Sequence, residues 1–132
     1  MKQFGLSKKE RIKSKKDFDF VFSNGEYIFS PNKTFKAVFY IKKETEEAVL
    51  QAAFAVSKKS GIAVWRNRVK RLMRESFRLN KNILLPLIVD KKALVQIIFS
   101  SNSISFKSNK KIFLKDVMPQ IVDIMNQIKE KI

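Results

Sequence analysis

The chain has 132 residues, 45% of them hydrophobic, which is enough for one domain with a modest single core. Its 28 Lys and Arg against 12 Asp and Glu give a net charge of +16, and such a field favours a polyanionic partner. Since the sequence has no Cys and no His, it excludes disulfides, thiolate metal sites and catalysis by imidazole.

The sequence gives no sign of a membrane-bound or exported protein. No apolar run approaches the roughly 20 residues that span a bilayer. The first residues, MKQFGLSKKERIKSKK, lack the apolar stretch of a signal peptide. We therefore expect a cytoplasmic protein without a membrane partner, and nothing in the sequence predicts oligomerisation.

A first helix is predicted from residue 14 to about residue 24. The basic residues 1–13 before it are expected to be mobile. Ser14-Lys15-Lys16-Asp17 matches a helix capping box, with Asp in place of the usual Glu or Gln at its last position. Asn24-Gly25 is a suitable helix end.

The aromatic side chains of this helix admit two interpretations. Phe18, Val21 and Phe22 follow one another at helical spacing and share one face. They are either part of the core or part of a binding surface. Phe20 points the other way and needs a partner of its own.

Two strands are predicted next, at residues 33–42 and about 49–57, because apolar residues alternate there. On the first strand, Phe35, Ala37, Phe39 and Ile41 oppose Lys36, Val38 and Tyr40. On the second, Leu50, Ala52, Phe54 and Val56 oppose Gln51, Ala53, Ala55 and Ser57. That last face lacks bulk, so either a helix packs closely on it or a shallow cleft stays open. We favour the cleft, because Ser57 leads directly to basic residues.

A basic amphipathic helix is predicted from about residue 62 to 79, after a turn at Gly61. Its apolar face carries Trp65, Val69, Leu72, Met73, Ser76 and Leu79, with Phe77 at the edge. Its opposite face carries Arg66, Asn67, Lys70, Arg71, Arg74 and Arg78, with Arg68 at the border beside Glu75. Like charges at i, i+4 repel one another, and the arginine fork suits phosphate oxygens. We therefore interpret this face as a phosphate-binding surface rather than an idle solvated one.

The remaining elements complete an α+β fold. Residues 80–92 are expected to form a loop or short irregular helix, 94–99 a buried strand, and 100–111 a polar and basic loop. A last helix over 110–131 carries an apolar stripe, and Pro119 should kink it or mark its start. The predicted order is helix, strand, strand, helix, strand, helix, which gives a small mixed sheet packed with helices in a single domain over residues 1–132.

The carboxylates do not suggest a catalytic centre. Only Glu44, Glu46 and Glu47 cluster, in a connection that we expect to be a hairpin loop. A nuclease without His or Cys would need paired carboxylates that hold metal ions. We therefore predict no catalytic residue and no metal site, and interpret the chain as a binding component.

A specific pattern runs through the centre of the sequence: Ser57-Lys58-Lys59, Gly61, Ala63-Val64, Arg66-Asn67-Arg68-Val69-Lys70-Arg71 and Arg74-Glu75. In this pattern the chain resembles the protein subunit of bacterial ribonuclease P. The residues Arg11-Ile12-Lys13, Asp17-Phe18, Val21-Phe22 and Gly25 are similar to the first helix of that family. The resemblance covers roughly residues 10–100.

The resemblance implies a division of labour within a ribonucleoprotein. A large RNA subunit would hydrolyse precursor tRNA with magnesium ions and release the 5′ leader. The protein would bind the catalytic RNA and the leader, and would hold no cofactor itself. The resemblance also implies a left-handed βαβ crossover around the basic helix, although such crossovers are right-handed in about 98% of cases.

The resemblance further implies two sets of site residues. RNA-binding residues would be Lys58, Lys59, Arg66, Asn67, Arg68, Lys70, Arg71 and Arg74. A cleft for the leader would be lined by Phe18, Phe22, Ala53, Ala55 and Ser57, together with Val38 or Tyr40. Ile62 departs from the small polar residue that many members have there, which affects the turn before the helix.

Other functions are compatible with the charge alone. A general or ribosomal RNA-binding protein and an architectural DNA-binding protein are the alternatives, and a role at a membrane surface is the weakest. Stimulation of magnesium-dependent 5′ cleavage of precursor tRNA would separate them.

Overall fold

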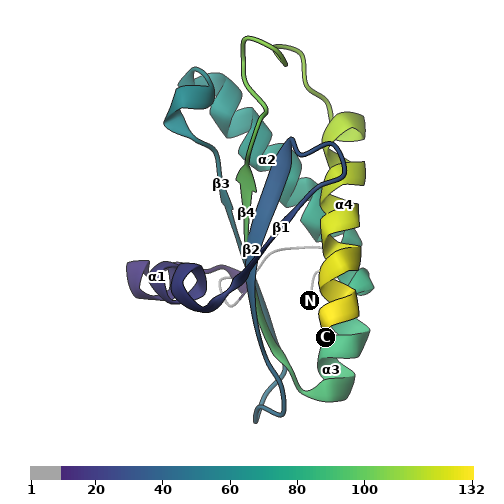
Figure 1. Ribbon diagram of the computed structural model, residues 1–132. Coiled ribbons are helices and arrows are strands. Elements are labelled where there is room, and N and C mark those ends of the chain that lie inside the picture. The colour runs from purple at the N-terminus through teal and green to yellow at the C-terminus, as the bar shows by residue number, and fades with distance from the viewer. Residues whose placement is uncertain (1–9) are drawn as a thin grey trace.

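The computed structural model describes residues 10–132. A four-stranded sheet has α1 on one side and the longer helices α2 and α4 on the other (Figure 1). The elements are α1 (Lys15–Asn24), β1 (Glu26–Phe29), β2 (Phe35–Lys42), β3 (Val49–Ala55), α2 (Ala63–Asn80), α3 (Leu85–Lys91), β4 (Leu94–Ser101) and α4 (Leu114–Lys131). Single 3-10 turns, η2 (Lys58–Ser60) and η3 (Lys81–Ile83), flank α2.

The α+β class is confirmed, with elements added to the predicted order. The strand β1 was missed, because a run of four residues after a helix end carries little periodic signal. It exists through its antiparallel pairing with β2. The short helix α3 is one of the two forms expected between residues 80 and 92.

The prediction of a hairpin between the strands at 33–42 and 49–57, which are β2 and β3, is wrong. The strand order is β1-β2-β4-β3, so β4 lies between β2 and β3. β4 runs antiparallel to β2 and parallel to β3. The true hairpin joins β1 to β2. The parallel pair β3 and β4 is connected through α2 and α3 as a βαβ crossover, whose handedness stays a prediction of the resemblance.

The main core lies between the sheet and the helices α2, α3 and α4. The sheet contributes Phe35, Ala37, Phe39, Leu50, Ala52, Val95, Ile97 and Phe99. The helices contribute Trp65, Val69, Met73, Phe77, Ile88, Val117, Ile121, Ile124, Met125 and Ile128. The α2 face therefore agrees with the prediction except at its end. Phe77 is fully buried rather than at the edge, and Leu79 is exposed.

The segment just before α1 is fixed, which contradicts the expectation of mobility for residues 10–13. Ile12 is buried and donates its backbone N–H to the Ala52 carbonyl over 3.1 Å, at the free edge of β3. Glu10 forms an ion pair of 2.7 Å with Lys81, which is itself buried. Residues 1–9, for which mobility was also predicted, lie outside the described part of the chain.

Two local signals act in α1 as predicted. The Ser14 hydroxyl accepts a hydrogen bond from the Asp17 backbone over 3.1 Å and caps the helix. The helix ends at Gly25, where the chain passes very close to its neighbours. A Cβ at this position would lie 2.6 Å from the Val21 carbonyl oxygen and 2.7 Å from the Phe39 carbonyl oxygen. Glycine is therefore required by the contact of α1 with β2.

Pro119 lies inside α4, which begins five positions earlier at Leu114. The prediction that this proline marks the helix start is therefore wrong. The kink expected as the alternative stays a prediction. Packing of the buried stripe on the sheet offsets the cost of a proline within a helix, about 3 kcal/mol.

We expect Gly25→Ala to lower the free energy of unfolding by about 1–3 kcal/mol, because the added methyl group meets backbone atoms that cannot rotate away. Urea denaturation measures this change. Ser23→Ala is the matched control on the exposed side of the same helix and should change stability by about 0.5 kcal/mol or less. Equal stability of the two variants would contradict a close approach at Gly25.

Candidate nucleic-acid interface

The basic face of α2 follows from the way this helix packs. Its apolar residues lie against the sheet and α4, so the basic residues point outward. Four basic residues and one amide line a shallow hollow of about 470 Å³ together with Val64: Arg68, Lys70, Arg71 and Arg74, with Asn67. We call these five residues the basic face. The structure thus brings together most of the predicted RNA-binding residues.

The other predicted RNA-binding residues lie at the start of the helix. Lys58 and Lys59 are exposed on the turn η2, which joins β3 to α2. Arg66 is half-buried, and its Nε donates to the Gly61 carbonyl over 3.0 Å. This bond uses one of the five N–H groups of the guanidinium and fixes its orientation.

The acid of α2 neutralises a residue outside the basic face. Glu75 accepts two hydrogen bonds from Arg78, at 3.1 and 2.6 Å. This bonding holds the pKa of Glu75 below its ordinary value, with partial burial in opposition and the charges of Arg74 and Arg71 in support. The carboxylate is therefore directed to Arg78, and the basic face keeps its excess of positive charge.

The start of α2 has no side-chain cap. Ile62 occupies the N-cap position, is exposed, and provides no oxygen for the first N–H groups. The turn before it depends on Gly61. A Cβ there would lie 2.6 Å from Cβ of Phe106 and 2.7 Å from the Trp65 ring.

The opposite side of the sheet carries α1. The small-residue face of β3 was expected either to pack closely against a helix or to leave a shallow cleft open, and it does each in a different place. Val21 and Ile12 pack on Val38, Ala53 and Ile98 in a second, smaller core. Ala53 is thus a small residue that lets the helix approach. The adjacent part of the face, beyond the end of α1, is open.

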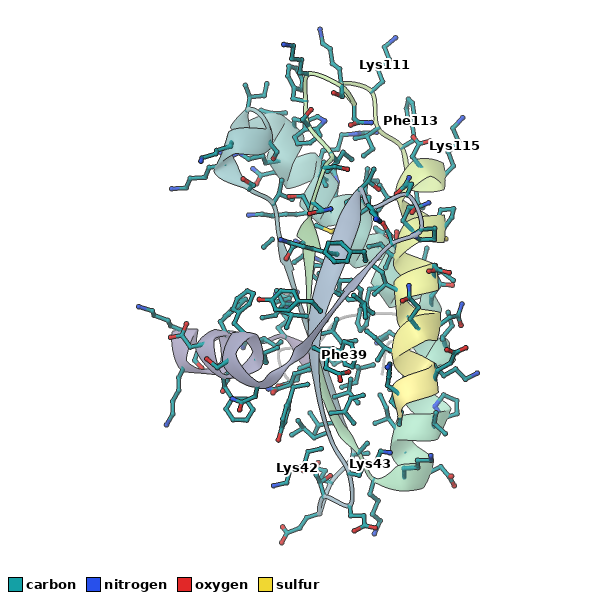
Figure 2. All side chains as sticks on the ribbon, viewed as in Figure 1. Phe39, Lys42, Lys43, Lys111, Phe113 and Lys115 are labelled. Atoms are coloured by element: carbon teal, nitrogen blue, oxygen red, sulfur yellow. The ribbon has the colours of Figure 1, made fainter. Side chains whose placement is uncertain are left out.

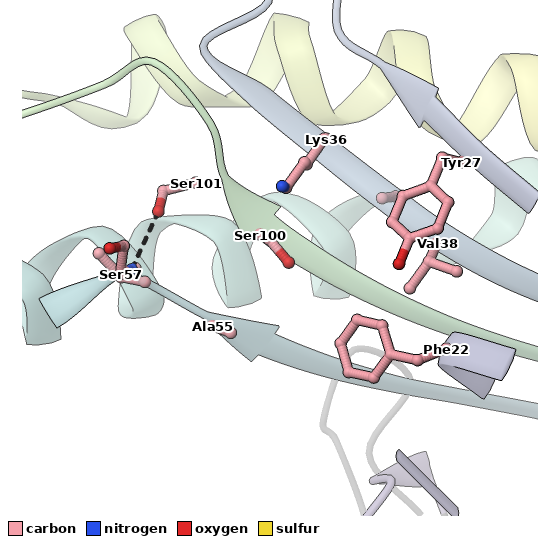
Figure 3. A pocket seen from close by; sticks show the side chains of 10 residues that line it. Phe22, Tyr27, Lys36, Val38, Ala55, Ser57, Ser100 and Ser101 are labelled. Atoms are coloured by element: carbon pink, nitrogen blue, oxygen red, sulfur yellow. Dashed lines mark hydrogen bonds between the residues drawn. The ribbon is translucent and has the colours of Figure 1, made fainter. Parts of the chain in front are cut away.

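An open hollow of about 290 Å³ occupies this adjacent part of the sheet (Figure 3). It is lined by Phe22, Tyr27, Lys36, Ala37, Val38, Ala55, Val56, Ser57, Ser100 and Ser101. We call it the sheet hollow. Four predicted cleft residues line it: Phe22, Val38, Ala55 and Ser57. A hydrogen bond of 3.1 Å from the Ser57 backbone to the Ser101 hydroxyl fixes its rim.

The remaining predicted cleft residues lie beside the sheet hollow and not among its lining. Phe18 and Tyr40 are partly buried against the second core, where Ala53 also lies. Tyr40 makes an edge-to-face contact with Phe20 at 4.8 Å between ring centroids, which supplies the partner that Phe20 was expected to need. Of the two first-strand candidates, Val38 is the one that lines the hollow.

Sequence reasoning missed six lining residues: Tyr27, Lys36, Ala37, Val56, Ser100 and Ser101. Lys36 shares a strand face with Val38, so the alternation alone could have indicated it. Ser100 is brought beside Lys36 only by the pairing of β4 with β2. Tyr27 lies on the missed strand β1, opposite Val38.

Carboxylates form no metal site in the part of the chain that the structure describes. No three His, Cys, Asp or Glu side chains of residues 10–132 are grouped so that they could hold a metal ion. Glu44, Glu46 and Glu47 are exposed on the connection between β2 and β3. Among the described helices, none has the length and apolarity needed to cross a membrane.

Three known proteins with a similar sequence share one description. The ribonuclease P protein component of Bacillus velezensis is 34% identical over 109 residues, which cover 80% of this chain and 84% of the relative. That of Porphyromonas gingivalis is 36% identical over 98 residues, or 73% of this chain and 69% of the relative. That of Macrococcus caseolyticus is 40% identical over 76 residues, or 58% and 63%.

Solved structures share the fold. The RNase P protein of Staphylococcus aureus has a TM-score of 0.67 at 23% identity, covering 91% of this chain and 95% of that one. The RNase P protein of Thermotoga maritima also has a TM-score of 0.67, at 22% identity, covering 89% and 96%. The family model for ribonuclease P matches residues 6–118. This match spans most of the chain and confirms the resemblance carried by the basic helix, so the chain belongs to the family of ribonuclease P protein components.

Proposed function

We propose that this chain binds the catalytic RNA of ribonuclease P through the basic face, and the 5′ leader of precursor tRNA through the sheet hollow. Family membership implies a role in processing the 5′ end of tRNA. The observation that carries the proposal is the basic face itself, where cationic side chains line one hollow and the acid of the helix is bound to Arg78.

Phosphate is the ligand that this face suits. Arg68, Arg71 and Arg74 offer planar forks that bind phosphate oxygens in pairs, and Lys70 adds a point charge. Their mutual repulsion costs a few tenths of a kcal/mol per neighbouring pair and is relieved by a polyanion. An RNA backbone supplies regularly spaced charges of this kind.

The sheet hollow suits an unpaired strand. Phe22 and Tyr27 present exposed rings at its sides, and the small side chain of Ala55 fills little of its volume. Aromatic rings stack on any base, so such a site tolerates varied sequences. Lys36 and the serines at the far end offer a charge and hydroxyl donors to phosphate and sugar.

We assign hydrolysis to the RNA subunit with its magnesium ions. The protein has no His and no Cys, and its described carboxylates do not gather into a ligand set. These described residues do not fit a resident metal. The protein's part is to hold the RNA and the substrate.

The assignment of hydrolysis to the RNA and of binding to the protein can be tested directly. The purified chain with magnesium should not cleave precursor tRNA, whereas adding it to a ribonuclease P RNA should increase cleavage at low magnesium. Gel analysis of the released leader measures both. If the chain alone cleaved precursor tRNA, and substitution of its carboxylates abolished that cleavage, the proposal would be contradicted. If the chain did not stimulate cleavage by the RNA, a general RNA-binding protein would be favoured.

The basic face should dominate the affinity for the catalytic RNA. Arg71→Ala with Arg74→Ala should weaken binding and flatten the slope of log Kd against log salt by roughly 0.7–0.9 per lost phosphate contact. Filter binding over a range of salt concentrations measures the slope. Lys129→Ala with Lys131→Ala removes the same charge from the end of α4 and should leave the slope unchanged. Equal slopes for the two variants would place the RNA elsewhere.

The sheet hollow can be tested by filling it. Ala55 is exposed within the hollow, so Ala55→Trp should leave folding intact. It should weaken binding of precursor tRNA by about tenfold, since one stacked base is typically worth about 1–3 kcal/mol. Binding of mature tRNA, which has no leader, should not change.

Ala53→Trp is the comparison variant for this test. Ala53 is buried under α1, so a large ring there should overpack the second core and lower stability by about 1–3 kcal/mol. Thermal melting and both tRNA affinities should be measured on each variant. If a stable Ala55→Trp protein lost affinity equally for precursor and mature tRNA, the leader would not bind in the sheet hollow.

A further inference from the structure

The loop between β4 and α4, which was expected to be polar and basic, carries a charged surface outside the basic face. Its exposed side chains are Lys107, Lys110, Lys111, Phe113 and Lys115, which we call the loop surface. Figure 2 shows Lys111, Phe113 and Lys115 together at one end of the molecule, far from Lys42 and Lys43 at the other end.

The loop is fixed to the first half of α2 and to the turn before it. The bonds run from Trp65 Nε1 to the Asn109 carbonyl (3.0 Å), from Arg68 Nε to the Ile112 carbonyl (2.9 Å) and from the Phe106 N–H to the Ser60 carbonyl (2.7 Å). Ile104 and Ile112 are buried beneath the loop. These contacts hold the loop surface in a defined position beside α2.

The charge of the loop surface is not compensated. The sequence has no Asp or Glu between Asp90 and Asp116. Asp116 itself accepts a hydrogen bond of 2.9 Å from the Phe113 N–H and so caps α4. Within residues 10–132, Glu75 pairs with Arg78 and Glu10 with Lys81, and no carboxylate of this part of the chain pairs with a loop lysine.

Phe113 is an unusual residue for its position. It stands at the N-cap of α4, where an oxygen-bearing side chain normally bonds to the helix, and the residue is 47% exposed. The Arg68 guanidinium carbon lies 5.7 Å from the ring centroid, and Nζ of Lys115 lies 5.8 Å from it. An exposed ring among cations is the arrangement that binds an unstacked base together with its phosphates.

From these observations we infer that the loop surface is a second RNA contact, which takes an unpaired segment of the catalytic RNA. Phe113 stacks on a base, and the lysines bind the phosphates on either side of it. The inference rests on the proposed function, since the partner is the RNA assigned to the basic face. Arg68 makes the two surfaces continuous, because it lines the basic face and also bonds to the loop.

The surface chemistry favours RNA over a lipid membrane. A membrane-binding segment needs several apolar side chains that enter the bilayer beside its basic ones. The loop surface exposes a single large apolar ring, since Ile104 and Ile112 are buried. A ring flanked by charges matches a base flanked by phosphates.

The first experiment removes the lysines from the full-length chain. The triple variant Lys107→Ala, Lys110→Ala, Lys111→Ala is compared with Lys42→Ala, Lys43→Ala, Lys129→Ala, which removes equal charge from exposed positions away from the loop. Binding to ribonuclease P RNA is measured over a range of salt concentrations. The loop variant should flatten the slope of log Kd against log salt by about two, from roughly 0.7 per contact. The control variant should keep the slope of the unmodified chain.

The outcomes separate this inference from the proposed function. If both triple variants behave alike while Arg71→Ala with Arg74→Ala weakens binding, the inference is overturned and the proposed function stands. If none of the variants affects binding to the RNA, both fail. A loop variant that loses affinity only for mature tRNA, or only for phosphatidylglycerol vesicles, would also overturn the inference.

The second experiment tests the ring. Phe113→Leu should weaken binding to the catalytic RNA by about tenfold, since a stacked base is lost while the apolar volume is largely kept. Phe113→Tyr keeps the ring and should restore most of the affinity. Thermal melting of both variants checks that α4 still forms. Equal affinity of the Leu and Tyr variants would show that the ring does not stack on a base.

Discussion

The packing of α2 on the sheet is the interaction on which the basic surfaces depend. Trp65, Val69, Met73 and Phe77 are buried against the strands and α4, and each large apolar side chain contributes about 1.5–3 kcal/mol when it leaves water. That gain exceeds the few tenths of a kcal/mol lost to each pair of like charges on the opposite face. The core therefore holds the cations together in a position that they would not adopt alone.

The insertion of β4 between β2 and β3 determines the shape of the other face. It sets Ser100 between Lys36 and Ala55 in one row across the sheet. Small and polar residues thus meet beyond the end of α1, and the floor stays low there. One row away, Val38, Ile98 and Ala53 support α1. The same sheet face is a core at one end and an open hollow at the other.

Arg68 and Trp65 connect the folding of α2 to a distant part of the chain. Both side chains bond to backbone carbonyls of the loop before α4, across 44 positions of sequence. The burial of Trp65 therefore stabilises the core and also positions the loop. Because Arg68 belongs to the basic face, the two surfaces have a fixed relation to one another.

The sequence by itself determined the features that depend on local periodicity: the faces of α2, the apolar stripe of α4, the two faces of β2 and β3, and the motif that identifies the family. It also gave the Ser14 cap and the end of α1 at Gly25. Only the tertiary structure decided the features that depend on contacts between distant segments. These are the existence of β1, the place of β4 in the sheet, the burial of Ala53 under α1, and the fixed loop around Phe113. The physical reason is that a side chain's face is set by its immediate neighbours, whereas strand pairing and the covering of a face depend on which distant elements meet there.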